Sequence, residues 1–184
     1  MLYAALAILA VDAGCGGSKA AVRLDPPAPE VPGVSSGLNP PVDFAFDSLD
    51  ERLVSADATR GVPTVIAFVT TSSLSSQAQV DFLVAMAKHD IDPAGSPAKD
   101  RVHYAVVALE SNENREMVAL YQKALSIPFP VALADAQTLA GTGPFGDLTA
   151  VPVTVLLDRA GRVVWRSDGR VVKSGEMRAL MRGL

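Results

Sequence analysis

Three short, almost wholly apolar stretches set the limits on how this chain can fold. They are Pro63 to Val69 (PTVIAFV), Val102 to Leu109 (VHYAVVAL) and Val153 to Leu157 (VTVLL). Apolar runs this short, rich in β-branched side chains, are typical of strands buried on both faces. Because such strands need cover above and below the sheet, the rest of the chain must supply helices.

Helical patterns follow each of the three runs. The predicted inner stripes are Val80, Leu83, Val84 and Ala87 after the first run, Met117, Leu120, Tyr121 and Ala124 after the second, and Met177, Leu180, Met181 and Leu184 near the end. We expect Asn112 or Asn114 to cap the second helix and Ser174 to cap the last. Asp92 to Asp100, which contains Pro93, Gly95 and Pro97, predicts a loop.

The order of these elements defines a fold class. Two strand–helix units come first and require a right-handed parallel crossover. The turn at Asp158 to Gly161 then returns Arg162 to Arg166 antiparallel to the third strand, as a hairpin before the last helix. The chain is therefore expected to be an α/β protein, with a mixed central β-sheet flanked by helices on both faces.

Several local sequences match one known family in the same order along the chain. The matching segments are Val42 to Phe44 with Phe46 to Asp50, Gly61 to Phe68, Ile127 to Val131, Val151 to Thr154, and Leu157 to Val164. From about Pro41 to the C-terminus the chain resembles the thioredoxin superfamily, in its TlpA-like and redoxin branch of envelope thiol–disulfide proteins. The resemblance implies a thioredoxin-like fold for residues 42–184.

The resemblance also points to an altered reaction site. Where the family has W-C-x-x-C, this chain has Ser72-Ser73-Leu74-Ser75-Ser76, which places Ser73 and Ser76 on the two cysteine positions. In the family, a thiolate at a helix N-terminus attacks a disulfide, and the second cysteine resolves the mixed disulfide. A serine hydroxyl stays protonated at neutral pH and forms no such bond. Ala67 also stands where some thioredoxins keep a buried aspartate.

These replacements favour a binding module over an enzyme. The simplest role for the serines is that Ser75 or Ser76 caps the following helix. The resemblance implies a cis Pro152 that faces the serine turn, with backbone groups of Val151 free to pair with an extended chain. We therefore expect a cleft for a peptide or an envelope protein, made by Thr71, Ser72, Ser73, Leu74, Val151 and Pro152.

The N-terminus predicts export. Leu2 to Val11 is apolar but too short to span a bilayer, and the small residues before Cys15 resemble the lipobox of bacterial lipoproteins. No Lys or Arg precedes the apolar run, so a simple secretory signal or a fortuitous cysteine remain alternatives. We expect a signal peptide over residues 1–15, lipidation at Cys15 and a Pro/Gly/Ser-rich tether over 16–41. The domain would then face the periplasm, anchored more readily in the outer than in the inner membrane.

Composition limits the kinds of partner and cofactor that the chain can bind. The chain has 184 residues, a net charge of -4 and a pI near 5.1, which gives nucleic acid no basic surface to bind. Cys15 is the single cysteine, so neither an internal disulfide nor a cysteine-based metal cluster can form within one chain. We expect no metal and no cofactor.

Other functions stay open at this point. One is a thiol–disulfide oxidoreductase or peroxiredoxin-like enzyme that takes its thiol from a partner or a small molecule. Another is a structural envelope lipoprotein that acts as a subunit. A serine hydrolase is disfavoured, because His89 falls near the far end of the helix that begins at the serines, His103 lies in a neighbouring strand, and no G-x-S-x-G turn is present.

Overall fold

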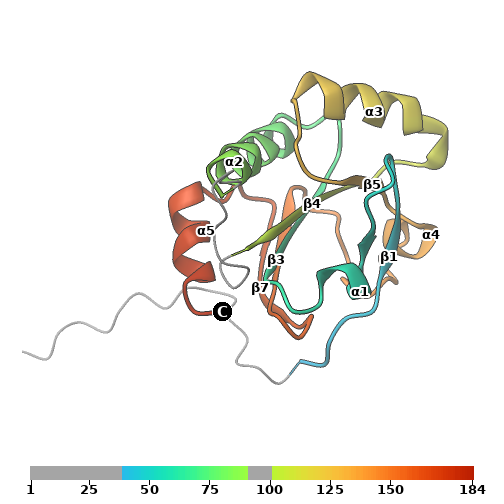
Figure 1. Cartoon of the computed structure of the whole chain (residues 1–184). Coiled ribbons are helices and arrows are strands. Elements are labelled where there is room, and N and C mark those ends of the chain that lie inside the picture. The colour runs from blue at the N-terminus through green and yellow to red at the C-terminus, as the bar shows by residue number, and fades with distance from the viewer. Residues whose placement is uncertain (1–38, 91–100) are drawn as a thin grey trace, which may run out of the picture. The chain divides into compact units, whose positions relative to one another are not determined.

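The computed structural model describes residues 39–90 and 101–184 (Figure 1). The predicted signal peptide, Cys15, the tether up to residue 38, and the whole of the predicted loop at 92–100 lie outside the described residues. All of the described residues belong to one compact unit.

A seven-stranded mixed sheet forms the centre of this unit, in the order β2-β1-β5-β4-β3-β6-β7. The strands are β1 (Ala45–Ser48), β2 (Val54–Ser55), β3 (Thr64–Val69), β4 (His103–Ala108), β5 (Val131–Leu133), β6 (Val153–Leu157) and β7 (Val163–Asp168). β4 is parallel to β3 and to β5, whereas β6 pairs antiparallel with β3 and with β7. The three predicted apolar strands and the C-terminal hairpin are thereby confirmed.

Helices cover both faces of the sheet, as expected, but unequally. They are α1 (Ala56–Thr59), α2 (Leu74–Asp90), α3 (Arg115–Ala124), α4 (Ala136–Leu139) and α5 (Ser174–Met181), with a 3-10 turn over Asn112–Asn114. The longer helices α2, α3 and α5 pack on one face, where Leu83, Val118 and Met177 are fully buried in a single cluster with Trp165 (Figure 1). Among the described residues, the other face has only the one-turn helices α1 and α4, together with the chain that follows α4.

Aromatic rings fill the second face where helices are scarce. Phe44 and Phe46 come from one segment and Phe68 and Phe145 from two others, and the ring centroids of the five pairs in contact lie 5.0 to 6.2 Å apart. Phe68 of β3 belongs to this cluster, while its neighbours Ala67 and Val69 face the helices on the other side. β3 is therefore buried from both sides, as its composition predicts.

The predicted inner stripe of α3 is correct at Tyr121, which packs against the core, and wrong at its other three residues. Val118 is fully buried, whereas the side chains of Met117 and Leu120 are 43% and 62% exposed and Ala124 is also exposed. Both stripes fit the helical period, so the periodicity alone does not choose between them. Arg115, in the first turn of α3, donates to the carboxylate of Asp47 at 2.7 Å, and this contact with β1 helps set the rotation of the helix.

One predicted helix cap is correct in position only, and another is wrong. Asn114 occupies the N-cap position of α3, but its side chain makes no capping bond and Asn112 lies in the 3-10 turn. Ser174 is the first residue of α5, and Lys173 holds the N-cap position instead. A shift of one residue in where a helix starts is enough to move the cap.

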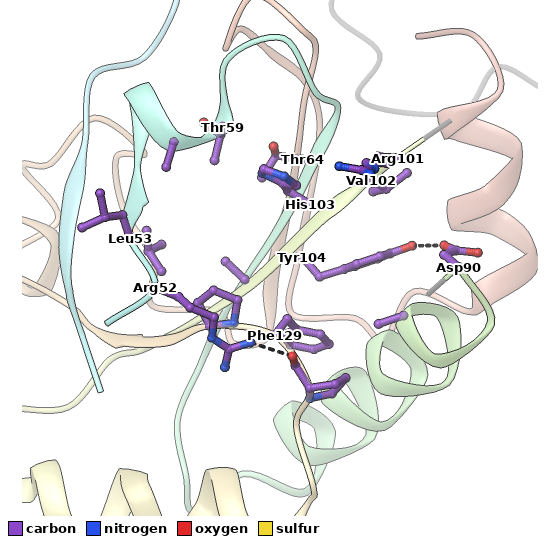
Figure 2. Close-up of a pocket in the computed structure, with 16 residues that line it drawn as sticks. Arg52, Leu53, Thr59, Thr64, Asp90, Arg101, Val102, His103, Tyr104 and Phe129 are labelled. Carbon is purple, nitrogen blue, oxygen red and sulfur yellow. Dashed lines mark hydrogen bonds between the residues drawn. The ribbon is translucent and has the colours of Figure 1, made fainter. Parts of the chain in front are cut away.

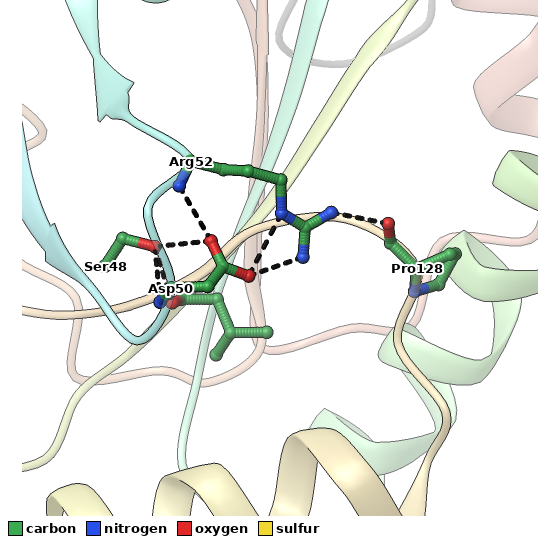
Figure 3. Close-up of polar contacts among 5 residues, drawn as sticks. Ser48, Asp50, Arg52 and Pro128 are labelled. Atoms are coloured by element: carbon green, nitrogen blue, oxygen red, sulfur yellow. Dashed lines mark hydrogen bonds and ion pairs between the residues drawn. The ribbon is translucent and has the colours of Figure 1, made fainter.

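Arg52 joins the β1–β2 connection to the chain before β5 (Figure 3). Arg52 donates to the carboxylate of Asp50 through Nε at 3.0 Å and Nη2 at 2.6 Å, and its Nη1 donates to the carbonyl of Pro128 at 2.6 Å. The guanidinium of Arg52 holds the pKa of Asp50 below its usual range. One side chain thus links two segments that are far apart in the sequence.

Candidate functional site

The serine-rich turn leads from the end of β3 into α2. Ser73 Oγ accepts from the backbone N–H of Ser76 at 3.2 Å, which is the bond of a helix N-cap. Ser76 is fully buried, and its Oγ accepts from the N–H of Thr70 at 3.3 Å. The expectation that Ser75 or Ser76 caps the helix is therefore wrong, because α2 begins at Leu74 and Ser73 precedes it.

The buried positions around this turn carry no ionisable group. Ala67 is fully buried in β3. Gln79, also fully buried, accepts from the N–H of Val172 at 2.6 Å and donates to its carbonyl at 3.4 Å, which ties α2 to the chain before α5. The amide and hydroxyl groups here form hydrogen bonds with each other or with the backbone. None of these groups can activate a nucleophile by taking its proton.

The histidines lie away from the serine turn. His89 is in the last turn of the 17-residue helix α2, about 20 Å along the helix from Ser76 at 1.5 Å per residue. His103 begins β4, whereas the serine turn follows the end of β3, and these two strands are parallel. Since neither imidazole can reach Ser73, the geometry disfavours serine hydrolase chemistry at this turn.

A glutamate that the sequence reasoning missed holds the serine turn from the side. The N–H and Oγ1 of Thr71 both donate to Oε1 of Glu110, at 3.1 and 2.8 Å. Glu110 follows β4, so a carboxylate just after a predicted parallel strand was the available signal. Met117 Sδ lies 3.8 Å from Thr71 Oγ1, which places α3 beside the same turn.

The Val151–Pro152 peptide bond is cis and lies at the same end of the sheet. In the antiparallel pairing of β3 and β6, Phe68 is opposite Val153, so the chain that precedes Val153 runs beside the residues that follow Phe68. Thr70 and Val151 both line a hollow of about 490 Å³, with α4 and the segment Asp147 to Thr149 as its other walls.

An exposed leucine lies at the start of α2, next to the serine-rich turn. Leu74, between Ser73 and Ser75, is 83% exposed, and Ser72 is exposed beside it. Thr71, Ser72, Ser73 and Leu74 therefore lie at the same end of the sheet as Val151 and Pro152, while Cys15 lies outside the described residues. Within residues 39–90 and 101–184, no group of three or more His, Cys, Asp or Glu side chains forms a metal site. None of the helices in those ranges has the length and apolarity needed to cross a membrane.

Comparison with solved structures identifies the fold. A DsbF homologue from Corynebacterium diphtheriae is similar at a TM-score of 0.66 and 15% identity, over 83% of this chain and 91% of that one. A thioredoxin-family thiol:disulfide interchange protein from Chlorobium tepidum is similar at 0.62 and 18%, over 79% and 94%. A secreted thiol-disulfide isomerase from Corynebacterium glutamicum is similar at 0.58 and 16%, over 74% and 80%.

These similarities show a thioredoxin-like fold, as the sequence resemblance implies. Identities this low establish the fold alone and do not carry an activity over to this chain. No family model matches the sequence. No curated protein matches it either.

The hydrogen bonds of the three serines predict different costs on removal. Ser73→Ala removes the N-cap and lowers the free energy of unfolding by about 1 kcal/mol. Ser76→Ala leaves the part-buried N–H of Thr70 without its acceptor, at a cost of about 2 kcal/mol. Ser75 Oγ contacts only the Ser73 hydroxyl in this turn, at 2.9 Å, so Ser75→Ala is the matched control. Urea unfolding measures all three, and equal costs for Ser75→Ala and Ser76→Ala would contradict this assignment.

Proposed function

We propose that this protein is a redox-inactive thioredoxin-like module that binds an extended polypeptide or a protein partner. The binding cleft comprises Thr71, Ser72, Ser73, Leu74, Val151 and Pro152. The observation that carries the proposal is that serine hydroxyls hold the start of α2, since Ser73 Oγ accepts from the N–H of Ser76 and Ser76 Oγ accepts from the N–H of Thr70. We take these two serines to stand at the positions where the family that the chain resembles has its cysteines.

The chemistry of exchange explains why this substitution matters. Thiol–disulfide exchange needs a thiolate to attack, and a second thiol to release the product. The helix N-terminus and the free N–H groups that favour a thiolate are retained here, but the atoms they would act on are oxygens. The single cysteine, Cys15, belongs to the N-terminal segment and not to the thioredoxin-like domain.

The surface around the turn supports binding. Leu74 and Met117 present apolar side chains to solvent, 83% and 43% exposed, on either side of Thr71. The hollow beside Val151 offers room for a partner side chain. It lies next to the backbone segment that leads into β6 and that is not itself part of a strand. An extended chain can pair with such a segment while its side chains fill the neighbouring hollow.

We also propose that the protein is an envelope lipoprotein, with the module held off the membrane by the tether over residues 16–41. The apolar run from Leu2 to Val11 and the lipobox-like residues before Cys15 support this location. The similarity to a secreted thiol-disulfide isomerase of Corynebacterium glutamicum agrees with export.

The first test is for redox activity. The purified chain is expected to leave the rate of insulin disulfide reduction by dithiothreitol at its uncatalysed value, because no thiolate is present at the helix start. The double variant Ser73→Cys with Ser76→Cys supplies a thiol pair, and Ser75→Cys with Ser76→Cys is the matched control with the wrong spacing. Insulin turbidity measures the rate. Acceleration by the unmodified chain would show that the proposal is wrong.

The second test is for binding without thiol chemistry. Reduced, carboxymethylated lactalbumin is an unfolded probe with no free thiols, and we expect it to bind the full chain. Leu74→Glu removes apolar contact at the front of the cleft and should weaken binding about tenfold, which corresponds to about 1.4 kcal/mol. Leu120→Glu makes the same change at an exposed leucine outside the cleft and is the control. Fluorescence anisotropy measures both, and equal losses in the two variants would exclude the cleft.

The third test is for the anchor. Cells that express the chain with labelled palmitate should incorporate the label, and Cys15→Ala should lose it because the thiol that receives the lipid is gone. Cys15→Ser controls for side-chain size, since a hydroxyl is not lipidated at a lipobox. Autoradiography of the purified protein gives the readout. An unlabelled chain of natural sequence would rule out lipidation.

A further inference from the structure

A cavity of about 530 Å³ lies at the end of the sheet opposite to the serine turn (Figure 2). It adjoins the first half of β4, and its walls include Leu53, Val54, Ala58, Tyr104 and Phe129. The serine turn follows the last residue of β3, whereas this cavity lies beside the first residues of β4, which runs parallel to β3. The cleft of the proposed function and this cavity are therefore separate sites.

The cavity exists because β5 stops pairing with β4 partway along it. The last backbone bond on that side joins the N–H of Val106 to the carbonyl of Pro130 at 3.1 Å, and the pairing of the two strands begins at Val106 and Val131. The N–H of His103 donates to Pro63, on the β3 side. Because successive residues of a strand point their N–H groups to opposite sides, the N–H and carbonyl of Tyr104 face the cavity.

Two prolines account for this stop. If the parallel pairing seen at Val106 and Val131 continued towards the start of β4, the N–H of residue 130 would donate to the carbonyl of Tyr104. Residue 130 is a proline and has no N–H. The carbonyl of Pro128, which would accept from the N–H of Tyr104, accepts instead from Nη1 of Arg52 at 2.6 Å. Among the described residues, the edge of β4 from Val102 to Tyr104 is thus left without a neighbouring strand.

The walls of the cavity come from both faces of the sheet. Val54 and Ala58 lie towards the face that holds α1, and Ala87 and Asp90 belong to α2 on the other face. A strand added in the plane of the sheet points its side chains alternately to the two faces. The cavity therefore has the shape that an added strand needs, and Leu53, 75% exposed, forms its apolar rim.

The charges at the rim leave a positive excess. Asp90 accepts from Tyr104 Oη, as Figure 2 shows, and it also accepts from Arg178, while Arg52 is paired with Asp50. Arg101 is exposed, lines the cavity and has no ion pair with the described residues. An acidic residue on the occupant complements this guanidinium.

We propose that this β4-edge groove binds an extended segment of a partner protein by strand addition. The groove is defined by Leu53, Val54, Val102, Tyr104 and Phe129, with Arg101 at its rim. Backbone groups of Val102 and Tyr104 form hydrogen bonds with the segment. Alternate apolar side chains of the segment pack against the two walls of the groove, and an acidic side chain of the segment forms an ion pair with Arg101. This site extends the proposed function to a second partner-binding surface, and it does not depend on the cleft at the serine turn.

The test uses an array of short acetylated peptides that alternate Val, Ile, Leu or Phe with Ser, Thr or Glu. The full chain should bind a subset that contains Glu near one end, and the strongest peptide is then measured in solution by fluorescence anisotropy. The same peptide with N-methyl groups on alternate nitrogens, which cannot pair along one edge, should bind at least about tenfold more weakly, a loss of about 1.4 kcal/mol. Amide hydrogen exchange at Tyr104 should slow when the peptide binds.

Leu53→Glu is the groove variant, because Leu53 is exposed enough for the fold to tolerate the change. It should weaken binding about tenfold, while Leu120→Glu, the matched change at an exposed leucine of α3, leaves the affinity unchanged. Arrays without a binder would overturn the proposal. So would affinity that survives N-methylation, or slowed exchange at the residues of the serine turn in place of Tyr104.

Discussion

The burial and double pairing of β3 is the constraint on which the rest of the molecule depends. Each residue from Thr64 to Val69 is buried, with β4 on one edge and β6 on the other. Its odd and even side chains belong to two different cores, one under α2 and one under the phenylalanine cluster. A strand held in this way cannot shift, so the turn that follows it and the strands beside it occupy defined places at both ends of the sheet.

At the end where β3 leads into α2, serine hydroxyls hold the local structure in place. Ser73 caps the helix and Ser76 holds the N–H of Thr70, which are bonds that oxygen makes better than sulfur. Glu110 accepts a hydrogen bond from the N–H of Thr71, and the cis peptide bond at Pro152 lies at the same end of the sheet. The start of α2 thus presents hydroxyls and an exposed Leu74 at this end of the sheet.

At the other end, the same sheet is left incomplete. Pro128 and Pro130 end the pairing between β4 and β5, and Arg52 occupies the carbonyl that would have extended it. An unpaired strand edge is usually covered or shortened, because it invites pairing with another chain. Here it faces a cavity with apolar walls, so the features that limit the strand also create a place where a partner strand can bind.

Much of this architecture is determined by the sequence. Apolar runs rich in β-branched residues lead to buried strands, and the turn at Asp158 to Gly161 leads to a hairpin, because these are local properties of the chain. The cleft residues were predicted through the family resemblance, and their binding role stays a prediction. The tertiary structure alone decided that Val118, rather than Met117 or Leu120, faces the core, since two stripes fit one helical period. It also decided the contacts of Glu110 and Arg52 and the open edge at Tyr104, because each depends on segments far apart in the sequence that meet only once the sheet has formed.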